Sequence, residues 1–194
     1  TTALSILRLL PGGIGKVTEG EIYYNGASVL SMTKKELMQI RGEKISMIFQ
    51  NPLTSLNPVF TVGEQIAMVL RKHRHLSARE ANQSAARLLE MVGIPGARLS
   101  DYPMQFSGGM RQRVGIAAGL ACNPELLIAD EPTTALDVTI QAQILELMKK
   151  LQREHDSSLL MITHNLGIIA ELCDKVAVMY AGKIVEKGPV GDIF

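Results

Sequence analysis

Residues 106–137 read FSGGMRQRVGIAAGLACNPELLIADEPTTALD and carry three kinds of local chemistry at short spacing. Ser107, Gly108 and Gly109 place a hydroxyl group and two unhindered backbone N–H groups just before the apolar helical stretch 114–121. Free N–H groups and a polar capping side chain make a helix N-terminus a binding site for anions. This Ser-Gly-Gly turn is therefore predicted to bind a phosphate group.

A short apolar run at residues 126–129 precedes two adjacent carboxylates. The run, Leu-Leu-Ile-Ala, is typical of a buried strand in a parallel sheet, and it ends abruptly at Asp130, Glu131 and Pro132. In α/β proteins, ligands bind at the carboxyl edge of the sheet. One carboxylate at that edge can hold a metal ion through a water molecule, while the other polarises a nucleophilic water. Residues 135–137, Ala-Leu-Asp, then open a new helix.

These pieces together resemble the ATPase subunits of ABC transporters, in both order and spacing. Ser-Gly-Gly followed by a basic helix resembles the signature motif, and the apolar run resembles the Walker B strand. Glu131 then resembles the catalytic glutamate, and residues 135–137 resemble the D-loop. Each piece alone has an ordinary interpretation, since Ser-Gly-Gly is usually a turn and an Asp-Glu pair usually lies in a hydrated loop. Their occurrence together favours the ATPase.

The resemblance implies an α/β fold, the ABC-type P-loop NTPase nucleotide-binding domain. This fold has a mostly parallel sheet flanked by helices, a helical subdomain and a small antiparallel β part. We expect residues 1–50 to hold the helix after the P-loop, the β part and the Q-loop strand. Residues 51–121 are expected to form the helical subdomain that ends in the signature motif. Residues 122–194 would complete this partial domain with the Walker B, D-loop and switch-histidine segments.

Length and composition predict one soluble domain with a subdomain. The chain has 194 residues, 46% hydrophobic content and a formal net charge of +1, and this charge argues against a nucleic-acid partner. The sequence has neither an apolar run of the roughly 20 residues that span a membrane nor an opening signal segment. With the resemblance, this places the protein at the cytoplasmic face of a bacterial or archaeal cell membrane, as a peripheral subunit.

The N-terminal segment predicts a helix that lacks its beginning. Residues 1–10 carry apolar residues at helical spacing. In the resembled family this helix directly follows the P-loop, Gly-x-x-x-x-Gly-Lys-Ser/Thr, a motif that the 194 residues do not contain. Residues 12–16 end in Gly-Lys, but Leu10 stands where the first glycine belongs and Val17 where Ser or Thr belongs. We therefore expect a chain truncated just after its P-loop, without its N-terminal strands and inactive on its own.

Two capping boxes mark helix starts. Thr33 precedes Glu36 by three residues, and Ser77 precedes Glu80 by the same spacing. In this motif the Ser or Thr side chain and the Glu side chain bond each other's backbone N–H groups. We therefore expect a short helix after Thr33. A longer helix is expected after Ser77, within residues 62–121, where apolar residues recur at helical spacing.

A glutamine follows the first predicted strand of the sheet. Residues 44–49 are predicted to form a strand that ends at Gln50, before the proline-interrupted loop 51–58. A glutamine at a strand end usually caps a loop. With the Walker B resemblance downstream, Gln50 more closely resembles the Q-loop glutamine, which contacts magnesium and whose loop faces a transmembrane partner.

A histidine stands at the end of a later predicted strand. Residues 138–155 carry an apolar stripe typical of a helix that covers a sheet, and residues 158–163 are predicted to form a buried strand that ends at His164. A lone histidine is most often structural, yet this one resembles the family's switch histidine, which contacts the γ-phosphate. Residues 166–172 are predicted to form a helix, and residues 175–187 an antiparallel hairpin.

The resemblance assigns a role to each group at these strand ends, with ATP and Mg²⁺ as ligands. Asp130 is expected to hold magnesium through water, and the carbonyl oxygen of Gln50 to complete the magnesium shell. Glu131 is expected to orient and deprotonate the attacking water, while His164 steadies the γ-phosphate.

The signature motif is expected to serve a different nucleotide. In ABC ATPases the signature of one subunit closes over ATP held by the P-loop of another, so Ser107, Gly108 and Gly109 would bind the ATP of a second subunit. Asp137, in the D-loop, would lie at the seam between the two subunits. Whether the two subunits are identical is left open.

Nearly the whole chain resembles the oligopeptide and dipeptide importer ATPases. The stretches that carry this resemblance are residues 48–52, 54–58 and 106–113, and Met110 matches the form of the signature in this subfamily. Nickel importers share much of the pattern, so the cargo is left open. The implied partners are transmembrane permease subunits, a second ATP-binding subunit and, indirectly, an extracytoplasmic substrate-binding protein, with no nucleic acid.

Two other classes of function share some of these motifs. ABC ATPases of DNA repair or chromosome maintenance need a long coiled coil or a zinc insertion between the Q-loop and the signature. Residues 51–106 contain neither sustained heptads nor paired cysteines. A non-catalytic regulatory module would fit the missing P-loop, but truncation explains that absence more economically.

Overall fold

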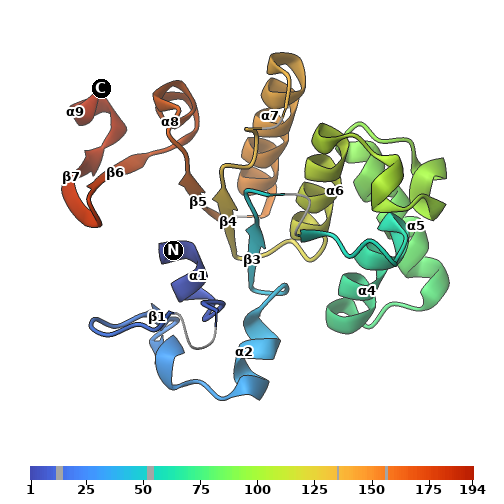
Figure 1. The fold of residues 1–194 in the computed structure, drawn as a ribbon, viewed down its shortest axis with the longest axis horizontal. Helices are drawn as coiled ribbons and strands as arrows, with labels where there is room; N and C mark the ends of the chain where they lie inside the picture. Colours follow the sequence, from blue (N-terminus) through green and yellow to red (C-terminus); the bar gives the residue numbers. More distant parts are fainter. Residues whose placement is uncertain (12–14, 52–54, 135, 156) are drawn as a thin grey trace.

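The computed structural model describes residues 1–11, 15–51, 55–134, 136–155 and 157–194, with the backbone alone at residues 151 and 155 (Figure 1). A three-stranded parallel sheet lies at its centre, in the order β3 (Ile45–Ile48), β4 (Leu126–Asp130), β5 (Ser158–Ile162). The register pairs Ile48 with Ala129 and Asp130 with Ile162, so the carboxyl ends of the strands meet at one edge. The α/β fold class is confirmed.

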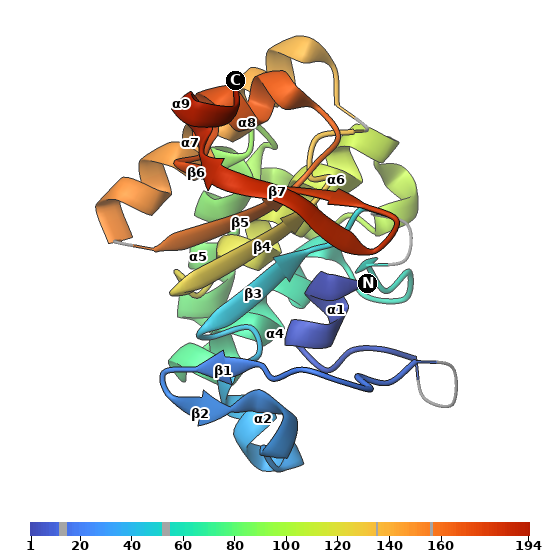
Figure 2. The same ribbon diagram turned by 90° about the vertical axis from the view of Figure 1, so that its left-hand side faces the viewer.

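The two faces of this sheet are covered by different helices. Side chains alternate between faces along a strand. Leu127 belongs to the larger core, which it shares with residues of α6 (Gly108–Leu120) and α7 (Val138–His155). Ile128 belongs to a smaller core with Ala3 of α1 (Thr2–Ile6). Figure 2 shows α1 on the near face of the sheet, with α4, α5 and α6 behind it.

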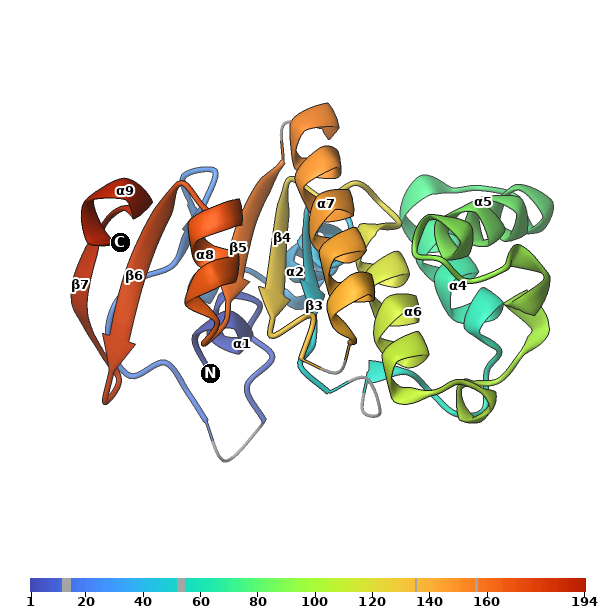
Figure 3. The ribbon, with the colours of Figure 1, turned by 90° about the horizontal axis from the view of Figure 1, so that it is seen from above.

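A helical block lies to one side of the sheet, as residues 62–121 predict (Figure 3). It consists of α4 (Val62–Arg74), α5 (Ala78–Met91), two short 3₁₀ segments, η2 (Gly96–Ser100) and η3 (Pro103–Gln105), and then α6. Both predicted capping boxes are confirmed, at Thr33 before α2 (Lys34–Ile40) and at Ser77 before α5. Figures 1 and 3 place α6 on the side of this block that faces the central sheet, with α4 and α5 beyond it.

Two small antiparallel hairpins lie beyond the central sheet. The N-terminal one pairs β1 (Tyr23–Tyr24) with β2 (Ala27–Ser28) and leads into η1 (Val29–Ser31). The C-terminal part consists of α8 (Leu166–Leu172), the hairpin of β6 (Lys175–Tyr180) and β7 (Lys183–Pro189), and α9 (Val190–Ile193). Within the described residues, neither hairpin pairs with the central sheet.

Two elements differ from their predictions. The helix predicted over residues 1–10 ends at Ile6, because Arg8 adopts a left-handed φ of 49°. The carbonyl oxygen of Leu7, which has no helical donor because residue 11 is a proline, accepts from Arg41 Nε at 2.9 Å. The predicted burial of residues 158–163 is wrong. Strand β5 is partly exposed, with Leu160 at 37%, because in the described part of the chain it pairs on one edge only, with β4.

The predicted stripe of the helix at residues 138–155 is largely confirmed. Ile144 is buried at 2% exposure, and Ile140 and Leu147 pack against the same core. The fourth position of the stripe, Leu151, lies outside the described side chains. None of the helices in the described ranges is long and apolar enough to cross a membrane.

Candidate functional site

Glu131 lies at the carboxyl edge of the sheet in an unusual backbone conformation. It follows β4 directly and has a φ of 45°, in the left-handed region that residues other than glycine rarely adopt. Its amide N donates to the carbonyl oxygen of Ile162, the last residue of β5, at 2.9 Å. This bond extends the β4–β5 pairing by one residue and holds the chain where the turn begins. A strained residue at a strand end is a candidate functional position.

Three hydrogen-bond partners from three segments converge on the Glu131 carboxylate. Gln50 Nε2, just after β3, donates to Oε2 at 3.1 Å, and Thr134 Oγ1, in the loop after β4, donates to the same oxygen at 3.0 Å. His164 Nδ1, two residues after β5, lies 3.0 Å from Oε1. The parallel topology explains the meeting, since strand ends at the same edge bring their following residues together.

The same contacts fix the charge of the Glu131 side chain. Hydrogen bonds from His164, and then from Thr134 and Gln50, lower the pKa of the Glu131 carboxyl below its ordinary value of 4.5. The side chain of Glu131 is 21% exposed, whereas that of His164 is 76% exposed and open to a ligand. The carboxylate is therefore ionised at neutral pH.

Asp130 and Gln50 offer oxygen atoms beside this carboxylate. Asp130 ends β4 and is half-buried, and its carboxylate has no hydrogen-bond or ion-pair partner among the described residues. Gln50 uses its Nε2 toward Glu131, so the other end of the same amide, Oε1, can face a cation. The described residues hold no cluster of three or more His, Cys, Asp or Glu side chains arranged for a metal. This donor set fits Mg²⁺, which takes few protein oxygens and keeps water and phosphate ligands.

Ser107 caps the helix that the sequence predicts. Its side chain accepts a hydrogen bond from the Met110 amide at 3.3 Å, and α6 begins at Gly108. Ser107 and Gly108 are exposed and Gly109 is half-buried, and a Cβ at Gly108 would meet no described atom within 4 Å. The turn therefore presents its N–H groups on an open surface.

The segment before this turn is firmly held. The Arg98 guanidinium lies 4.2 Å from the ring centroid of Phe106, and it pairs with Asp101 at 2.6 Å. Arg111 Nε donates to the carbonyl oxygen of Pro103 at 2.7 Å. These contacts fix the position of the turn before any ligand arrives.

The structure brings some of the predicted residues together and not others. Gln50, Glu131 and His164 meet, and Asp130 adjoins them in the chain. Within the described residues, no hydrogen bond joins this group to the turn at residues 107–109. Asp137 caps α7, since its Oδ1 accepts from the Ile140 amide at 2.9 Å. Ala135 of the D-loop and residues 52–54 of the Q-loop stretch lie outside the described residues.

Two polar residues at this site are absent from the sequence-based prediction. Thr134 bonds Glu131, and Gln112 of α6, only 2% exposed, donates from Nε2 to the carbonyl oxygen of Pro132 at 2.9 Å. Neither contact has a pattern of its own in the sequence, because each depends on the turn that Glu131 makes. The signal available for Thr134 is its place three residues after Glu131, within a tight loop.

Comparisons with known proteins identify the family to which this chain is similar. The ABC transporter family matches residues 1–134. The oligopeptide transport ATP-binding protein OppD of Bacillus subtilis (strain 168) is 55% identical over 195 residues, which cover 100% of this chain and 54% of that protein. The dipeptide transport ATP-binding protein DppD of the same organism is 54% identical, over 100% of this chain and 58% of that protein. The chain thus spans somewhat more than half the length of these relatives.

Solved structures give the same result at lower sequence identity. The ATP-binding cassette MJ0796, a dimer in a post-hydrolysis state bound to ADP and Pi, superposes with a TM-score of 0.82 at 31% identity. The match covers 89% of this chain and 74% of that chain. A second dimeric structure of MJ0796, described as a bacterial ABC transporter cassette, gives a TM-score of 0.81 at 32% identity.

Proposed function

The chain belongs to the ABC transporter family, and from this membership we propose that it is the ATP-binding and ATP-hydrolysing part of an importer of di- or oligopeptides. The intact protein couples ATP hydrolysis to peptide uptake across the cytoplasmic membrane. One observation carries the proposal: Glu131, Gln50 and His164 meet at the carboxyl edge of the sheet. The names of OppD and DppD, given for oligopeptide and dipeptide transport, support the class of cargo.

Glu131 is the general base of this proposal. Its carboxylate is ionised, and it lies where an attacking water can reach it from the open edge of the sheet. In the arrangement described, the same hydrogen bonds that hold the carboxylate also weaken it as a base. When His164 turns to the γ-phosphate, Oε1 loses its partner and the proton affinity of Glu131 rises. Binding of ATP thereby increases the basicity of the carboxylate that activates the attacking water.

Gln50 connects this base to the magnesium position. Asp130, acting through water, and Gln50 Oε1 would hold Mg²⁺, which supplies positive charge to the phosphates when bound. The Nε2 end of the same Gln50 amide bonds Glu131. The orientation of one amide therefore sets both where the cation is held and where the base points.

The signature turn acts on the nucleotide of a second subunit. Ser107, Gly108 and Gly109 lie on an open surface, and among the described residues no hydrogen bond links them to the Glu131 group. The dimeric state of the MJ0796 cassettes supports this arrangement. In the proposed dimer, Asp137 would lie near the seam between the subunits. The further partners are the permease subunits and, through them, a substrate-binding protein. Among the described residues of 51–106, the two longest helices, α4 and α5, are too short for the long coiled coil that DNA repair would require.

Reconstitution tests this proposal. The full-length protein, assembled with its permease subunits in proteoliposomes, should hydrolyse ATP faster when the peptide-loaded binding protein is present. Di- or oligopeptide uptake should depend on ATP. Uptake of Ni²⁺ in place of peptide would reject the cargo, and stimulation of hydrolysis by DNA alone would reject the transporter class. Absence of any ATP hydrolysis in the complete assembly would reject the enzyme.

A further inference from the structure

Gln112 is a buried polar side chain that the roles above do not explain. It is 2% exposed, and its Nε2 donates to the Pro132 carbonyl oxygen at 2.9 Å. Its Oε1 is buried without a hydrogen-bond donor among the described residues. An apolar side chain of similar size would avoid the cost of burying an unpaired acceptor. The hydrogen bond to the loop is therefore the specific contribution of this amide.

The bond from Gln112 reaches the residue next to the proposed base. Glu131 is held from one side by its own amide, bonded to the Ile162 carbonyl oxygen at 2.9 Å. From the other side, Gln112 fixes the carbonyl of Pro132, which is buried together with Thr133. The two bonds clamp the short segment on which Glu131 takes its left-handed φ of 45°. Without the second bond, the direction of the Glu131 side chain is less restricted.

Arg113, the next residue of α6, is tied to the helical block. Its Nη1 donates to the carbonyl oxygens of Val92 and Gly93 at 3.1 and 3.0 Å, at the end of α5. Gly93 has a φ of +72°, and a Cβ there would lie 3.0 Å from the same Nη1. The left-handed backbone therefore favours glycine at this position, and a Cβ there would crowd the guanidinium. Two consecutive residues of α6 thus have different partners. Gln112 holds the loop that carries Glu131, and Arg113 holds the end of α5.

We propose that Gln112 is a positioning residue for Glu131, and that α6 transmits the position of the helical block to the carboxylate through it. The inference rests on the proposed function, in which Glu131 is the base. Helix α6 begins right after Ser107, so the signature turn and the clamp on Glu131 belong to one 13-residue helix. A displacement of the signature turn or of α5 therefore displaces Pro132.

Kinetics of single variants of the full-length protein test the positioning role. Gln112→Met keeps the volume of the side chain and removes its N–H donor. We expect kcat to fall about 10- to 100-fold, as for other small misplacements of a catalytic group, with the KM for ATP within about twofold of wild type. Val114→Ala is the matched control, because Val114 is fully buried on the same helix. It should lower thermal stability and leave kcat unchanged.

A double-mutant cycle tests transmission from the helical block. Arg113→Met removes the bonds to the end of α5 and should lower kcat through the displaced helix. If Gln112 carries that effect, the double variant should have a kcat within about threefold of Gln112→Met, because residues that act through one contact are not additive. If the fold-losses in kcat of the two single variants multiply in the double variant, the proposed transmission is wrong. It is also wrong if Arg113→Met leaves kcat unchanged.

Amide exchange separates this inference from the proposed function. In nucleotide-free protein, the Glu131 amide should exchange roughly tenfold faster in Gln112→Met and in Arg113→Met, and at the wild-type rate in Val114→Ala. If wild type lacks ATPase activity but shows this pattern, the proposed function fails and the clamp stands. If wild type is active and the pattern is absent, the inference fails alone. Should Gln112→Met not fold, the exchange rate in Arg113→Met decides.

Discussion

Glu131 combines backbone strain with a fully engaged carboxylate. A left-handed backbone at a residue other than glycine costs on the order of 1–3 kcal/mol, and it persists where surrounding contacts enforce it. Here the hydrogen bond from the Glu131 amide to the Ile162 carbonyl oxygen enforces it. The side-chain contacts with Gln50, Thr134 and His164 add to this restraint. The neighbours that restrain the side chain also set its proton affinity, so position and basicity change together.

The first prediction concerns that proton affinity. The hydrogen bond from His164 is the largest cause of the lowered Glu131 pKa, so His164→Ala should raise the pKa toward 4.5. Carboxyl-carbon NMR of labelled glutamate, titrated in the nucleotide-free protein, measures it. His75→Asn is the control, because exposed His75 caps α4 with a left-handed φ of 53° that asparagine tolerates. An unchanged Glu131 pKa in His164→Ala would contradict the assignment.

The sign of the pH effect follows from the direction of the shift. Because folding lowers the pKa of Glu131, its carboxylate stabilises the fold at pH values above about 4.5, and this contribution is lost as the pH falls through the lowered value. In His164→Ala this dependence of the free energy of unfolding on acid pH should become weaker, while the hydrogen bonds from Thr134 and Gln50 keep part of it.

Single residues at strand ends were predictable, and those in turns were not. Gln50 and His164 each follow a strand with a clear apolar pattern, and a parallel sheet brings such positions to one edge. Thr134 and Gln112 act through the turn after β4, which no periodic pattern describes. The roles assigned to Asp130, Glu131, Gln50 and His164 remain predictions until a variant is measured.

At the scale of elements, local hydrogen bonds define where helices begin. The capping box of α5 is complete, with the Glu80 amide donating to Ser77 Oγ at 3.3 Å and the Ser77 amide to Glu80 Oε2 at 2.9 Å. Its signal is a spacing of three residues, which the sequence displays directly. The two residues that follow α5, Val92 and Gly93, in turn provide the carbonyl oxygens that hold Arg113.

The second prediction tests this cap. Ser77→Ala removes the acceptor for the Glu80 amide and should lower the free energy of unfolding by about 1 kcal/mol. Urea unfolding, followed by far-ultraviolet circular dichroism, measures the change. Ser84→Ala, in the interior of the same helix, is the matched control and should be neutral or slightly stabilising. Equal losses in the two variants would mean that the cap contributes nothing specific.

Elements whose limits depend on distant contacts were predicted less well. The apolar spacing of residues 1–10 continues past Ile6, but the left-handed backbone of Arg8 ends the helix, and the Leu7 carbonyl accepts from Arg41, far along the chain. The apolar run at residues 158–163 predicts burial, whereas the exposure of β5 depends on what pairs with its second edge. Neither the end of this helix nor the neighbours of β5 can be predicted from a short stretch of sequence.

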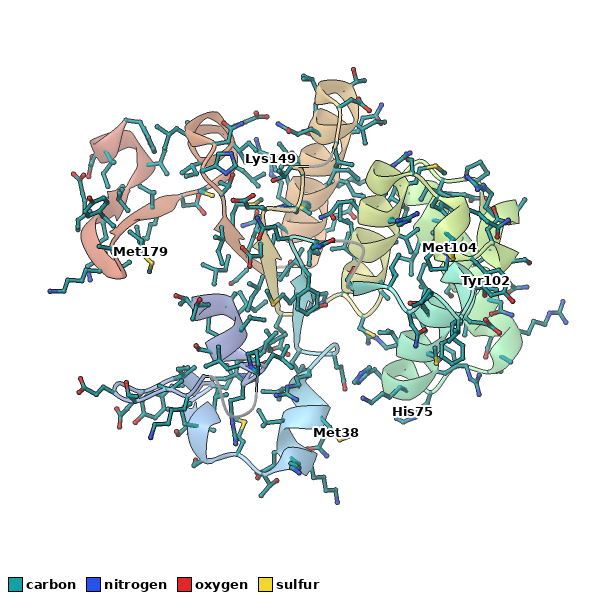
Figure 4. The ribbon with its side chains drawn as sticks, in the orientation of Figure 1. Met38, His75, Tyr102, Met104, Lys149 and Met179 are labelled. Carbon is teal, nitrogen blue, oxygen red and sulfur yellow. The ribbon has the colours of Figure 1, made fainter. Side chains whose placement is uncertain are left out.

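At the scale of the whole molecule, apolar side chains are exposed on the C-terminal strands. Leu160 of β5, Met179 of β6 and Ile184 and Val185 of β7 are 37%, 53%, 50% and 61% exposed. Figure 4 shows Met179 on the hairpin of β6 and β7. It also shows Met104, which is 78% exposed, on the helical block far from that hairpin. Apolar side chains gathered on strands favour association, particularly beside an unpaired strand edge.

The third prediction is that residues 1–194, expressed alone, associate through these strands. Light scattering behind size-exclusion chromatography should show a mass that rises with concentration. Ile184→Lys with Val185→Lys should reduce the association, because two charges oppose apolar contact. Met104→Lys, on the helical block, should leave the association unchanged. A monomer at all concentrations, or equal effects of the two sets of substitutions, would contradict the assignment of this surface.

The central claim is that Glu131 activates the water that attacks ATP, and Glu131→Gln in the full-length protein tests it most directly. The amide keeps the shape of the side chain but cannot take the proton, so kcat should fall about 10²- to 10⁴-fold while ATP binding stays within about threefold of wild type. Glu125→Gln, where Glu125 precedes β4 and pairs with Lys44 at 2.7 Å, is the control and should keep its turnover. Near-wild-type turnover in Glu131→Gln, measured by steady-state phosphate release, would contradict the account.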